Sequence, residues 1–396
     1  MSRSTPRKPQ TNPLSDAVQL GGLSVDQFLA HHWQRKPLLV RQALPAIKPP
    51  LSAEALIELA SDDAVQSRRV SAFNGRWQLA HGPFEPGELP PLSRKRWTLL
   101  VQGVNLHNDA AHALMSRFRF IPDARLDDLM ISLASDQGGV GPHLDSYDVF
   151  LVQIWGQRLW KIAPPGNDAF RPDLPLKILE RFEPAEQWLL QPGDMLYLPP
   201  GWAHDGIAQG ACMTASVGFR APSRIEFLRE FLAQSADDPG GPDPRFSDPG
   251  RARARRPAGL PDDLAAQLTG WAQEWRPSRT QIADFIGRYL TEPAATVFFD
   301  EGPRQSPQRF SAEARKHGLC LDRKTRMLHR GGRLFINGES LDALRGSRAK
   351  WLITLADKRA LDAVETSYAL GDTLVAQVLH EWLGAGWLRL AKSRSS

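Results

Sequence analysis

Two neighbouring residues in the middle of the chain have the types and spacing of a metal-binding pair. His143 and Asp145 lie in the segment Gly141-Pro142-His143-Leu144-Asp145. On an extended chain, residues i and i+2 point to the same face, so the imidazole and the carboxylate are predicted to lie side by side. Because an H-x-D pair is common and alone indicates little, a metal site needs a third ligand elsewhere in the chain.

The third ligand is predicted at His204, which ends the segment Gly193–His204. This segment reads G-x5-P-x-G-x2-H, a strand followed by a Pro-Gly turn and a histidine at the start of the next strand, and it resembles the second conserved motif of cupins. The interval between the pair and the distal histidine is 204 − 145 = 59 residues. Two histidines and one carboxylate form the facial triad of non-haem Fe(II) oxygenases, which leaves coordination positions open for a co-substrate and dioxygen.

Short strands broken by glycine and proline surround these residues. Between Leu129 and Phe219 the predicted strands are Met130–Ser135, Asp148–Ile154, Arg158–Ile162, Gln187–Leu190, Met195–Leu198 and Cys212–Phe219. Several of them alternate apolar with small or polar side chains. This spacing predicts an antiparallel sandwich or barrel, the class that includes jelly rolls and cupins, as the mainly β core that positions the ligands.

The chain divides into four predicted segments. Residues 1–22 are a polar tail, residues 23–221 the N-terminal helices and the β core, residues 222–300 three amphipathic helices with a Pro-, Gly- and Arg-rich loop, and residues 301–396 a winged-helix-like α+β unit. The aromatic faces of the three helices need a partner surface, which is either the rest of the chain or a second copy of it. Within the N-terminal part, Asn74-Gly75 predicts a tight hairpin.

The composition is that of a globular protein. Of the 396 residues, 42% are hydrophobic and 23% charged, and Lys plus Arg exceed Asp plus Glu by 49 − 44 = 5. No run approaches ~18 apolar residues, which excludes a membrane span, and the N-terminus lacks the apolar run of a secretory signal. The two cysteines, Cys212 and Cys320, exclude a disulfide framework and a cysteine-based zinc site, and they predict a reducing cytoplasm.

The segment from about Trp97 to Arg220 resembles the JmjC-domain 2-oxoglutarate oxygenases, and within them the bacterial ribosomal oxygenases. The strings that carry the resemblance are Trp97–Gln102, Asp127–Ser132, Gly139–Asp145, Tyr147–Phe150, Gly193–Gly201 and Ser216–Pro222. The order of parts is similar along nearly the whole chain. The resemblance implies a double-stranded β-helix (a jelly-roll or cupin-like JmjC barrel) as the core, a homodimer formed through the helices between about Pro222 and Leu290, and a C-terminal winged helix.

The resemblance also assigns the main site residues. The family's iron ligands fall on His143, Asp145 and His204, and the arginine that holds 2-oxoglutarate falls on Arg158. An arginine suits a carboxylate because it donates two parallel, charged hydrogen bonds. Lys161 is close in sequence but has the opposite strand parity, so only one of the two can face inward.

Further residues are placed around the co-substrate and the substrate. Thr214 and Ser216 share a face of their strand and can add hydroxyl donors to the co-substrate, although Thr214 departs from the asparagine expected there. Asp136 is the candidate for pairing with a substrate guanidinium. Tyr147 and Asp148 are placed near the mouth of the barrel, where a structural role is equally open.

The implied activity is hydroxylation of an arginine β-carbon in a large-subunit ribosomal protein, with Fe(II) as cofactor, 2-oxoglutarate and O2 as co-substrates, and succinate and CO2 as products. Two alternatives stay open: the same chemistry on another protein or a small molecule, and a cupin-type ligand-sensing regulator with a DNA-reading winged helix. The predicted recognition helix, Asp372–Gly384, contains no Lys or Arg, whereas a groove-binding helix needs cations. DNA is therefore not a predicted partner, and neither is a membrane.

Overall fold

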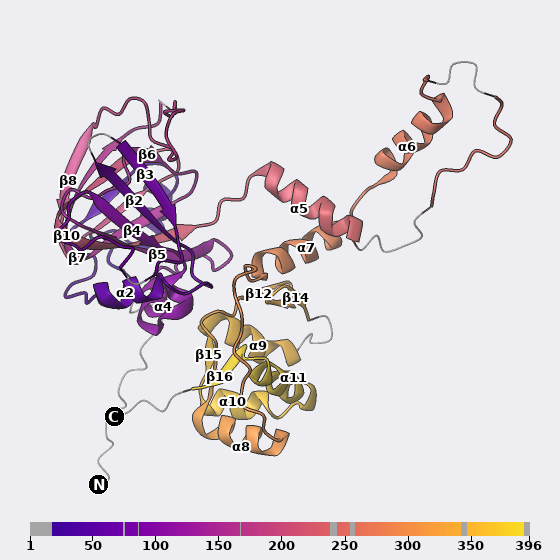
Figure 1. Ribbon diagram of the computed structural model, residues 1–396. Coiled ribbons are helices and arrows are strands. Elements are labelled where there is room, and N and C mark those ends of the chain that lie inside the picture. The colour runs from indigo at the N-terminus through magenta and orange to yellow at the C-terminus, as the bar shows by residue number, and fades with distance from the viewer. Residues whose placement is uncertain are drawn as a thin grey trace, which may run out of the picture.

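Residues 18–73, 76–85, 87–166, 168–237, 244–253, 258–341 and 347–391 are described by the computed structural model. Within these ranges a β barrel, an arm of helices and a smaller C-terminal domain follow one another along the chain (Figure 1). The predicted turn Asn74-Gly75, most of the predicted tail and parts of the loop 236–261 lie outside the described residues. The four segment boundaries stay predictions.

Ten strands form the antiparallel sheet that builds the barrel. They are β1 (Leu38–Val40), β2 (Ser67–Phe73), β3 (Arg76–His81), β4 (Trp97–Val101), β5 (Leu126–Ala134), β6 (His143–Leu144), β7 (Val149–Ala163), β8 (Glu186–Leu190), β9 (Met195–Leu198) and β10 (Ala203–Phe219). Their order is β1-β9-β7-β10-β5-β4-β2-β3, with β6 paired to β10 and β8 to β7. The predicted antiparallel β core is confirmed.

Two long strands, β7 and β10, cross the centre of this sheet. The sequence predicts Asp148–Ile154 and Arg158–Ile162 as separate strands, but the structure joins them in β7, so this prediction is wrong. A bulge explains the misleading pattern, because the pairing of β7 with β10 shifts register around Gly156. Gly156 has φ +62°, and a Cβ there would lie 2.3 Å from the Ala211 carbonyl oxygen, so the bulge requires glycine.

The two faces of the sheet pack differently. The outer face carries Phe150 and Tyr197 against Phe28 of helix α1 (Val25–His31), with further cover from α2 (Ala53–Leu59), α3 (Val104–His107) and α4 (Asp109–Ser116). Helix α1 begins at the capping box of Ser24 and Gln27. The inner face carries a second apolar cluster that includes Val149, Leu151, Trp160, Ile162, Leu190, Leu196 and Leu198. The site residues described below project from this inner face.

Three helices form an arm after β10: α5 (Arg224–Asp237), α6 (Asp262–Glu274) and α7 (Arg279–Thr291). In Figure 1, α6 lies well away from both the barrel and the C-terminal domain. Phe231 packs on Phe285 with ring centroids 5.1 Å apart, whereas Ile225, Leu228 and Leu232 of α5 remain exposed. The predicted amphipathic helices are confirmed, and the described chain covers only part of their apolar surface.

The C-terminal domain has a core of its own, with Phe310, Leu352 and Leu379 buried at its centre. Its helices are α8 (Pro307–His317), α9 (Ser347–Lys358), α10 (Ala363–Ala369) and α11 (Thr373–Gly384), and its strands are β11 (Leu319–Leu321), β12 (Met327–Arg330), β13 (Arg333–Ile336), β14 (Glu339–Ser340), β15 (Ala360–Leu361) and β16 (Leu388–Leu390). Strands β12 and β13 pair around Gly331-Gly332, which confirms the predicted hairpin. Within the described ranges, no helix is long and apolar enough to cross a membrane.

Candidate metal centre

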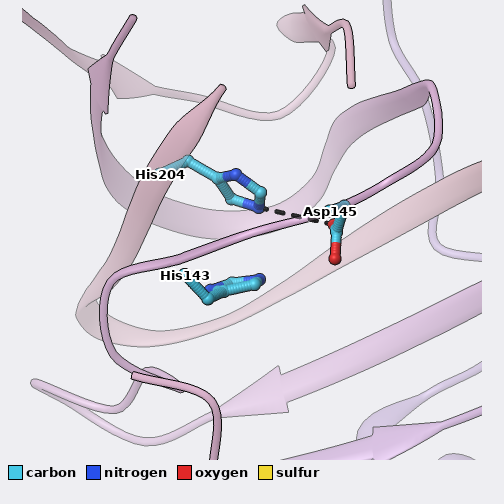
Figure 2. Close-up of side chains that lie close together, drawn as sticks. All are labelled: His143, Asp145 and His204. Atoms are coloured by element: carbon cyan, nitrogen blue, oxygen red, sulfur yellow. Dashed lines mark ion pairs between the residues drawn. The ribbon is translucent and has the colours of Figure 1, made fainter. Parts of the chain in front are cut away.

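His143, Asp145 and His204 meet at one place inside the barrel. Strand β6 pairs with the beginning of β10, and this register sets His143 opposite His204. The Gly201 N–H, in the predicted Pro-Gly turn, donates to the Asp145 carbonyl at 2.8 Å and so ties the two motifs together. One ligand atom from each of the three residues lies within 4.8 Å of the others. Figure 2 shows both imidazoles and the carboxylate turned toward one another.

Backbone carbonyls fix the ring orientation of both histidines. His143 Nδ1 lies 2.9 Å from the Gly141 oxygen, and His204 Nδ1 lies 3.0 Å from the Trp202 oxygen. Since a carbonyl only accepts, each Nδ1 carries the proton and each Nε2 presents its lone pair. His204 Nε2 lies 3.7 Å from Asp145 Oδ2. Two neutral imidazoles and a carboxylate fit a divalent cation that takes nitrogen and oxygen ligands, such as Fe(II).

Burial keeps His204 in the neutral form that a metal requires. Burial first, and then the neighbouring His143, lower the pKa of His204 to about 4, although the Asp145 carboxylate acts in the opposite direction. At neutral pH the Nε2 atom therefore carries no proton and can donate its lone pair to a metal.

A buried arginine lies on the inner face of β7. Arg158 is 5% exposed, and its Nη1 donates to Ser132 Oγ at 3.2 Å. Its Nε and Nη2 are buried without a hydrogen-bond partner among the described residues. Because a buried guanidinium is costly unless an anion accepts its hydrogen bonds, these two donors fit a carboxylate ligand. Lys161 has the opposite parity on β7 and is half-buried, in agreement with the predicted alternation.

Thr214 and Ser216 lie together on the inner face of β10, and both are buried. The register sets Thr214 opposite Gln153 of β7, and the Thr214 hydroxyl donates to Gln153 Oε1 at 2.9 Å. Gln153 Nε2 in turn donates to the Trp155 carbonyl at 2.8 Å. The predicted shared face is confirmed, while contact of either hydroxyl with a co-substrate stays a prediction. Gln153, which the sequence analysis missed, is what holds the threonine.

Asp136 has partners of its own just beyond the end of β5. Its carboxylate pairs with Lys95 Nζ at 2.8 Å and accepts the Gly210 N–H at 2.9 Å. The hydrogen bond from Lys95, followed by that from Gly210, lowers the pKa of Asp136. Pairing of Asp136 with a substrate guanidinium stays a prediction, and it would require the guanidinium to displace Lys95.

A carboxylate that the sequence analysis missed lies on the inner face of β5, at Asp128. It has the same strand parity as Ser132, and its Oδ2 accepts the Gly103 N–H at 3.0 Å. Burial, and then the adjacent Asp127, raise the pKa of Asp128 to about 6. The predicted strand begins at Met130, whereas β5 begins at Leu126. Asp128 lay outside the predicted strand, so the alternation of inward and outward side chains was not applied to it.

Tyr147 links Asp128 to the metal ligands. Its side chain is 40% exposed, and both Tyr147 and Asp128 border Gly218, where a Cβ would lie 3.5 Å from Asp128 Oδ1 and 4.0 Å from the tyrosine ring. Burial, and then the carboxylates of Asp145 and Asp128, raise the pKa of the Tyr147 hydroxyl. Tyr147 is thus close both to Asp128 and to the metal-ligand candidate Asp145.

Asp148 is held in the core by several partners. Its carboxylate is buried and accepts hydrogen bonds from the Tyr197 hydroxyl at 2.7 Å and Gln34 Nε2 at 2.9 Å, and it pairs with Arg125 at 3.3 Å. These contacts join the N-terminal helices to the barrel. Of the two readings that the sequence left open for Asp148, the structure favours the structural one.

Comparison with known proteins identifies both folded parts of the chain. A JmjC domain family model matches residues 113–227, and a ROXA-like winged helix model matches residues 271–389. The chain is 34% identical over 372 residues to the ribosomal protein uL16 3-hydroxylase of Escherichia coli K12, which covers 92% of this chain and 97% of that protein. It is also 36% identical over 200 residues to a probable ribosomal oxygenase of Haemophilus influenzae, about half of each chain.

Solved structures agree with the sequence relatives. The structure of YcfD, a ribosomal oxygenase from Escherichia coli, in complex with cobalt and 2-oxoglutarate is 33% identical, with a TM-score of 0.78 over 94% of this chain and 99% of that one. Another crystal structure of Escherichia coli YcfD matches with a TM-score of 0.80 at 32% identity. The predicted JmjC barrel and winged helix are confirmed. Because it matches both family models and is 34% identical over nearly its whole length to the uL16 3-hydroxylase, the chain belongs to the JmjC-domain ribosomal oxygenases.

Proposed function

We propose that this protein is an Fe(II)- and 2-oxoglutarate-dependent hydroxylase that adds a hydroxyl group to the β-carbon of an arginine in a large-subunit ribosomal protein. The observation that carries the proposal is the cluster of His143, Asp145 and His204, with both Nε2 lone pairs free, inside a barrel. The relative named as a uL16 3-hydroxylase spans nearly the whole chain and supports the substrate class.

The three clustered residues would hold Fe(II) through two Nε2 atoms and one carboxylate oxygen. Bound iron, with 2-oxoglutarate and O2, supplies the oxidising power that inserts one oxygen atom into a C–H bond while 2-oxoglutarate becomes succinate and CO2. The carbonyls of Gly141 and Trp202 keep the imidazoles in the tautomer and orientation that such a site needs.

Arg158 would bind the distal carboxylate of 2-oxoglutarate. Among the described residues its Nε and Nη2 have no hydrogen-bond partner, while Ser132 holds Nη1 and thereby fixes the plane of the guanidinium. Thr214 and Ser216 line the same inner face and would add hydroxyl groups to this pocket. A charged pair in a buried pocket is strong and directional, so the arginine orients the co-substrate as well as binding it.

Asp128 is better placed than Asp136 to receive a substrate guanidinium. Its Oδ1 points toward Gly218 beside Tyr147, and no ion pair within 4.0 Å is recorded for it among the described residues. An incoming arginine would place a cation within ion-pair distance of this buried carboxylate, and the tyrosine ring would lie beside the arginine side chain. The substrate arginine would then extend past Tyr147 toward the metal ligands.

Asp128→Asn is expected to stabilise the fold at neutral pH and to weaken substrate binding. The folded-state pKa of Asp128 is raised, so the folded protein binds the extra proton and its stability falls as pH rises through the window from about 4 to about 6. Above this window, removing the buried charge should add on the order of 1–2 kcal/mol, discounted from the full pKa shift because water reaches part of the side chain. Thermal unfolding at pH 7 and pH 4, with the KM for a substrate peptide, measures both effects.

The control for this variant is Asp173→Asn. Asp173 is exposed and forms an ion pair with Arg171 at 2.9 Å, so neutralising it should not raise the melting temperature at pH 7. The gain in stability of Asp128→Asn over wild type should be larger at pH 7 than at pH 4. An equal gain at both pH values would show that the ionised Asp128 carboxylate does not destabilise the fold. Unchanged peptide KM would remove it from the substrate site.

Mass spectrometry tests the proposed function directly. Ribosomal proteins are incubated with the purified enzyme, Fe(II), ascorbate and 2-oxoglutarate, and one added oxygen is expected on a single arginine-containing peptide. His143→Ala is the control in which this shift should be absent. Succinate formation without a modified ribosomal peptide would retain the oxygenase chemistry and reject the ribosomal substrate, leaving another protein or a small molecule. If both succinate formation and the modified peptide are absent, the proposed enzymatic activity is rejected.

A homodimer through α5, α6 and α7 is part of the proposal. Ile225, Leu228 and Leu232 recur at helical spacing and are 65%, 43% and 48% exposed, and Trp275 adds an exposed ring. An apolar stripe of this length on an arm that projects from the barrel needs a partner, and the same stripe on a second copy is self-complementary about a twofold axis.

Leu228→Lys combined with Leu232→Lys is expected to convert the dimer to a monomer. Two ammonium groups per chain would have to be buried without partners in an apolar interface, which costs several kcal/mol. Light scattering coupled to size-exclusion chromatography measures the mass. Glu230→Lys, on the opposite side of α5, is the control and should leave the dimer intact. A wild-type protein that is monomeric at micromolar concentration would contradict the proposal.

We also place this activity in the cytoplasm, where ribosomal proteins meet a reducing environment; the two cysteines are free thiols. DNA is not part of the proposal, since Thr373–Gly384, which forms α11, offers no Lys or Arg to a groove. The competing regulator with a DNA-reading winged helix predicts specific binding to duplex DNA, which a gel-shift assay at physiological salt checks.

A further inference from the structure

The turn between β11 and β12 is held rigidly inside the C-terminal domain. The Asp322 carbonyl accepts the Thr325 N–H at 3.0 Å, and the buried Thr325 hydroxyl donates to the Trp387 carbonyl at 2.9 Å. Arg359 Nη2 donates to the carbonyls of both Asp322 and Thr325, at 2.8 and 3.0 Å. Because these hydrogen bonds fix the backbone of the turn at both ends, they also fix the Cα positions of its arginines, Arg323 and Arg326.

Arg326, at the end of this turn, contacts the strand that carries Asp128. Its Nη2 donates to the Asp127 carbonyl at 2.9 Å and lies 3.9 Å from the Asp127 carboxylate. Burial, and then the neighbouring Arg220, lower the pKa of Arg326 to about 10, so the guanidinium stays charged at neutral pH. That charge also acts on the adjacent carboxylate, since Arg326 is among the groups that favour the ionised form of Asp128.

Arg323, at the other side of the turn, contacts the second segment that holds Asp128. Its Nε donates to the Leu106 carbonyl of α3 at 2.6 Å, and its Nη1 to Asp109 at 2.9 Å. Gly103, the N-cap residue immediately before α3, donates its N–H to the Asp128 carboxylate.

Helix α3 and β5 are joined a second time beside this bond. Asn105 Oδ1 accepts the Leu129 N–H at 2.8 Å, one residue after Asp128. The turn therefore contacts both segments: Arg323 binds α3, and Arg326 binds the start of β5. A shift of either segment would move the Asp128 carboxylate relative to the metal ligands.

We propose that the winged-helix domain is a positioning element of the substrate site: its turn Asp322–Arg326 holds Asp128 in place through Arg323 and Arg326, which act as positioning residues. The inference rests on the proposed role of Asp128 as the partner of the substrate guanidinium. It gives the C-terminal domain a function in the hydroxylation itself, in a domain whose α11 has no cations for nucleic acid.

Arg326→Ala is expected to raise the KM for the ribosomal peptide about tenfold, the ratio that follows from losing one hydrogen bond to a charged group and misplacing the carboxylate. The KM for 2-oxoglutarate and the slow peptide-free formation of succinate should stay unchanged, because the metal ligands and Arg158 are not touched. Arg330→Ala, an exposed arginine on β12 of the same domain, is the matched control and should leave all three values at wild type.

Hydrogen exchange gives a readout that does not depend on turnover. In the holoenzyme, the Gly103 amide should exchange faster in Arg326→Ala and in Arg323→Ala, because the bond from Gly103 to Asp128 opens more often, while the β7 and β10 amides around the metal site keep their protection. Uniformly faster exchange over the whole barrel would mean that the arginines only stabilise the fold, and would overturn the inference.

A double-mutant cycle separates this inference from the function on which it rests. If Arg326 acts through Asp128, then Arg326→Ala should weaken binding of the peptide, measured by calorimetry, in the wild-type background but not in Asp128→Asn. Additive losses would overturn the positioning role. If Asp128→Asn alone leaves peptide affinity unchanged, the proposed substrate site fails first, whatever Arg326→Ala does.

Discussion

His204→Ala and Asp145→Ala are each expected to abolish turnover of 2-oxoglutarate, with a fall in rate on the order of 10³-fold or more, because the metal supplies several kcal/mol of the catalytic effect. His204 is buried, its pKa is lowered, and its Nδ1 donates to the Trp202 carbonyl. Its Nε2 is therefore unprotonated and available to bind a metal. Succinate release with Fe(II), and calorimetric titration with Mn(II), measure turnover and metal affinity separately.

The control for the metal ligands is His31→Ala, a substitution of an exposed histidine on α1. It should leave both the rate and the metal affinity unchanged. Both ligand variants should fold, since each removes a side chain from the inner face without cutting a strand pairing, and the far-ultraviolet circular dichroism should match wild type. A folded His204→Ala or Asp145→Ala protein with full activity would refute the metal assignment.

The metal ligands could be predicted because their geometry is set locally. The pair His143 and Asp145 depends on the two-residue repeat of an extended chain, and His204 follows a Pro-Gly turn whose direction is fixed by its own residues. The structure adds one long-range fact, the pairing of β6 with the start of β10. The same local rule separated Arg158 from Lys161.

Residues that depend on cross-strand register could not be predicted in this way. Gln153 matters because it lies opposite Thr214, and this pairing follows from a bulge at Gly156 that looks like a strand end in the sequence. Ser132 matters because Arg158 reaches it from another strand. Neither contact leaves a mark in the spacing of neighbouring residues.

Contacts between domains are even harder to predict from a sequence pattern than contacts between strands. The spacing of helices and hairpin predicted a winged-helix-like unit, and the lack of cations in its last long helix argued against DNA. Nothing in that pattern indicated that Arg323 and Arg326, in a turn of the same domain, lie against the barrel. In the composition they are only two of the 49 Lys and Arg residues.

Arg158→Ala is expected to raise the KM for 2-oxoglutarate about 100-fold, since truncating one partner of a buried, charged hydrogen-bonded pair costs several kcal/mol. The metal affinity should stay at the wild-type value, because Arg158 contacts Ser132 and not the ligands. Initial rates at varied 2-oxoglutarate, with Mn(II) titration alongside, separate the two effects.

Lys161→Ala is the matched control, because it removes a cation three residues away on the same strand but from the opposite face. If the inner face of β7 binds the distal carboxylate, this variant keeps the wild-type KM for 2-oxoglutarate, whereas Arg158→Lys keeps a charge but loses the fork and should fall between alanine and wild type. The reverse ranking, with Lys161→Ala impaired and Arg158→Ala normal, would place the co-substrate on the lysine. Since Arg158 and Lys161 lie on the same stretch of β7, which pairs with β10 without a register shift, this ranking would contradict the strand parity that the structure shows.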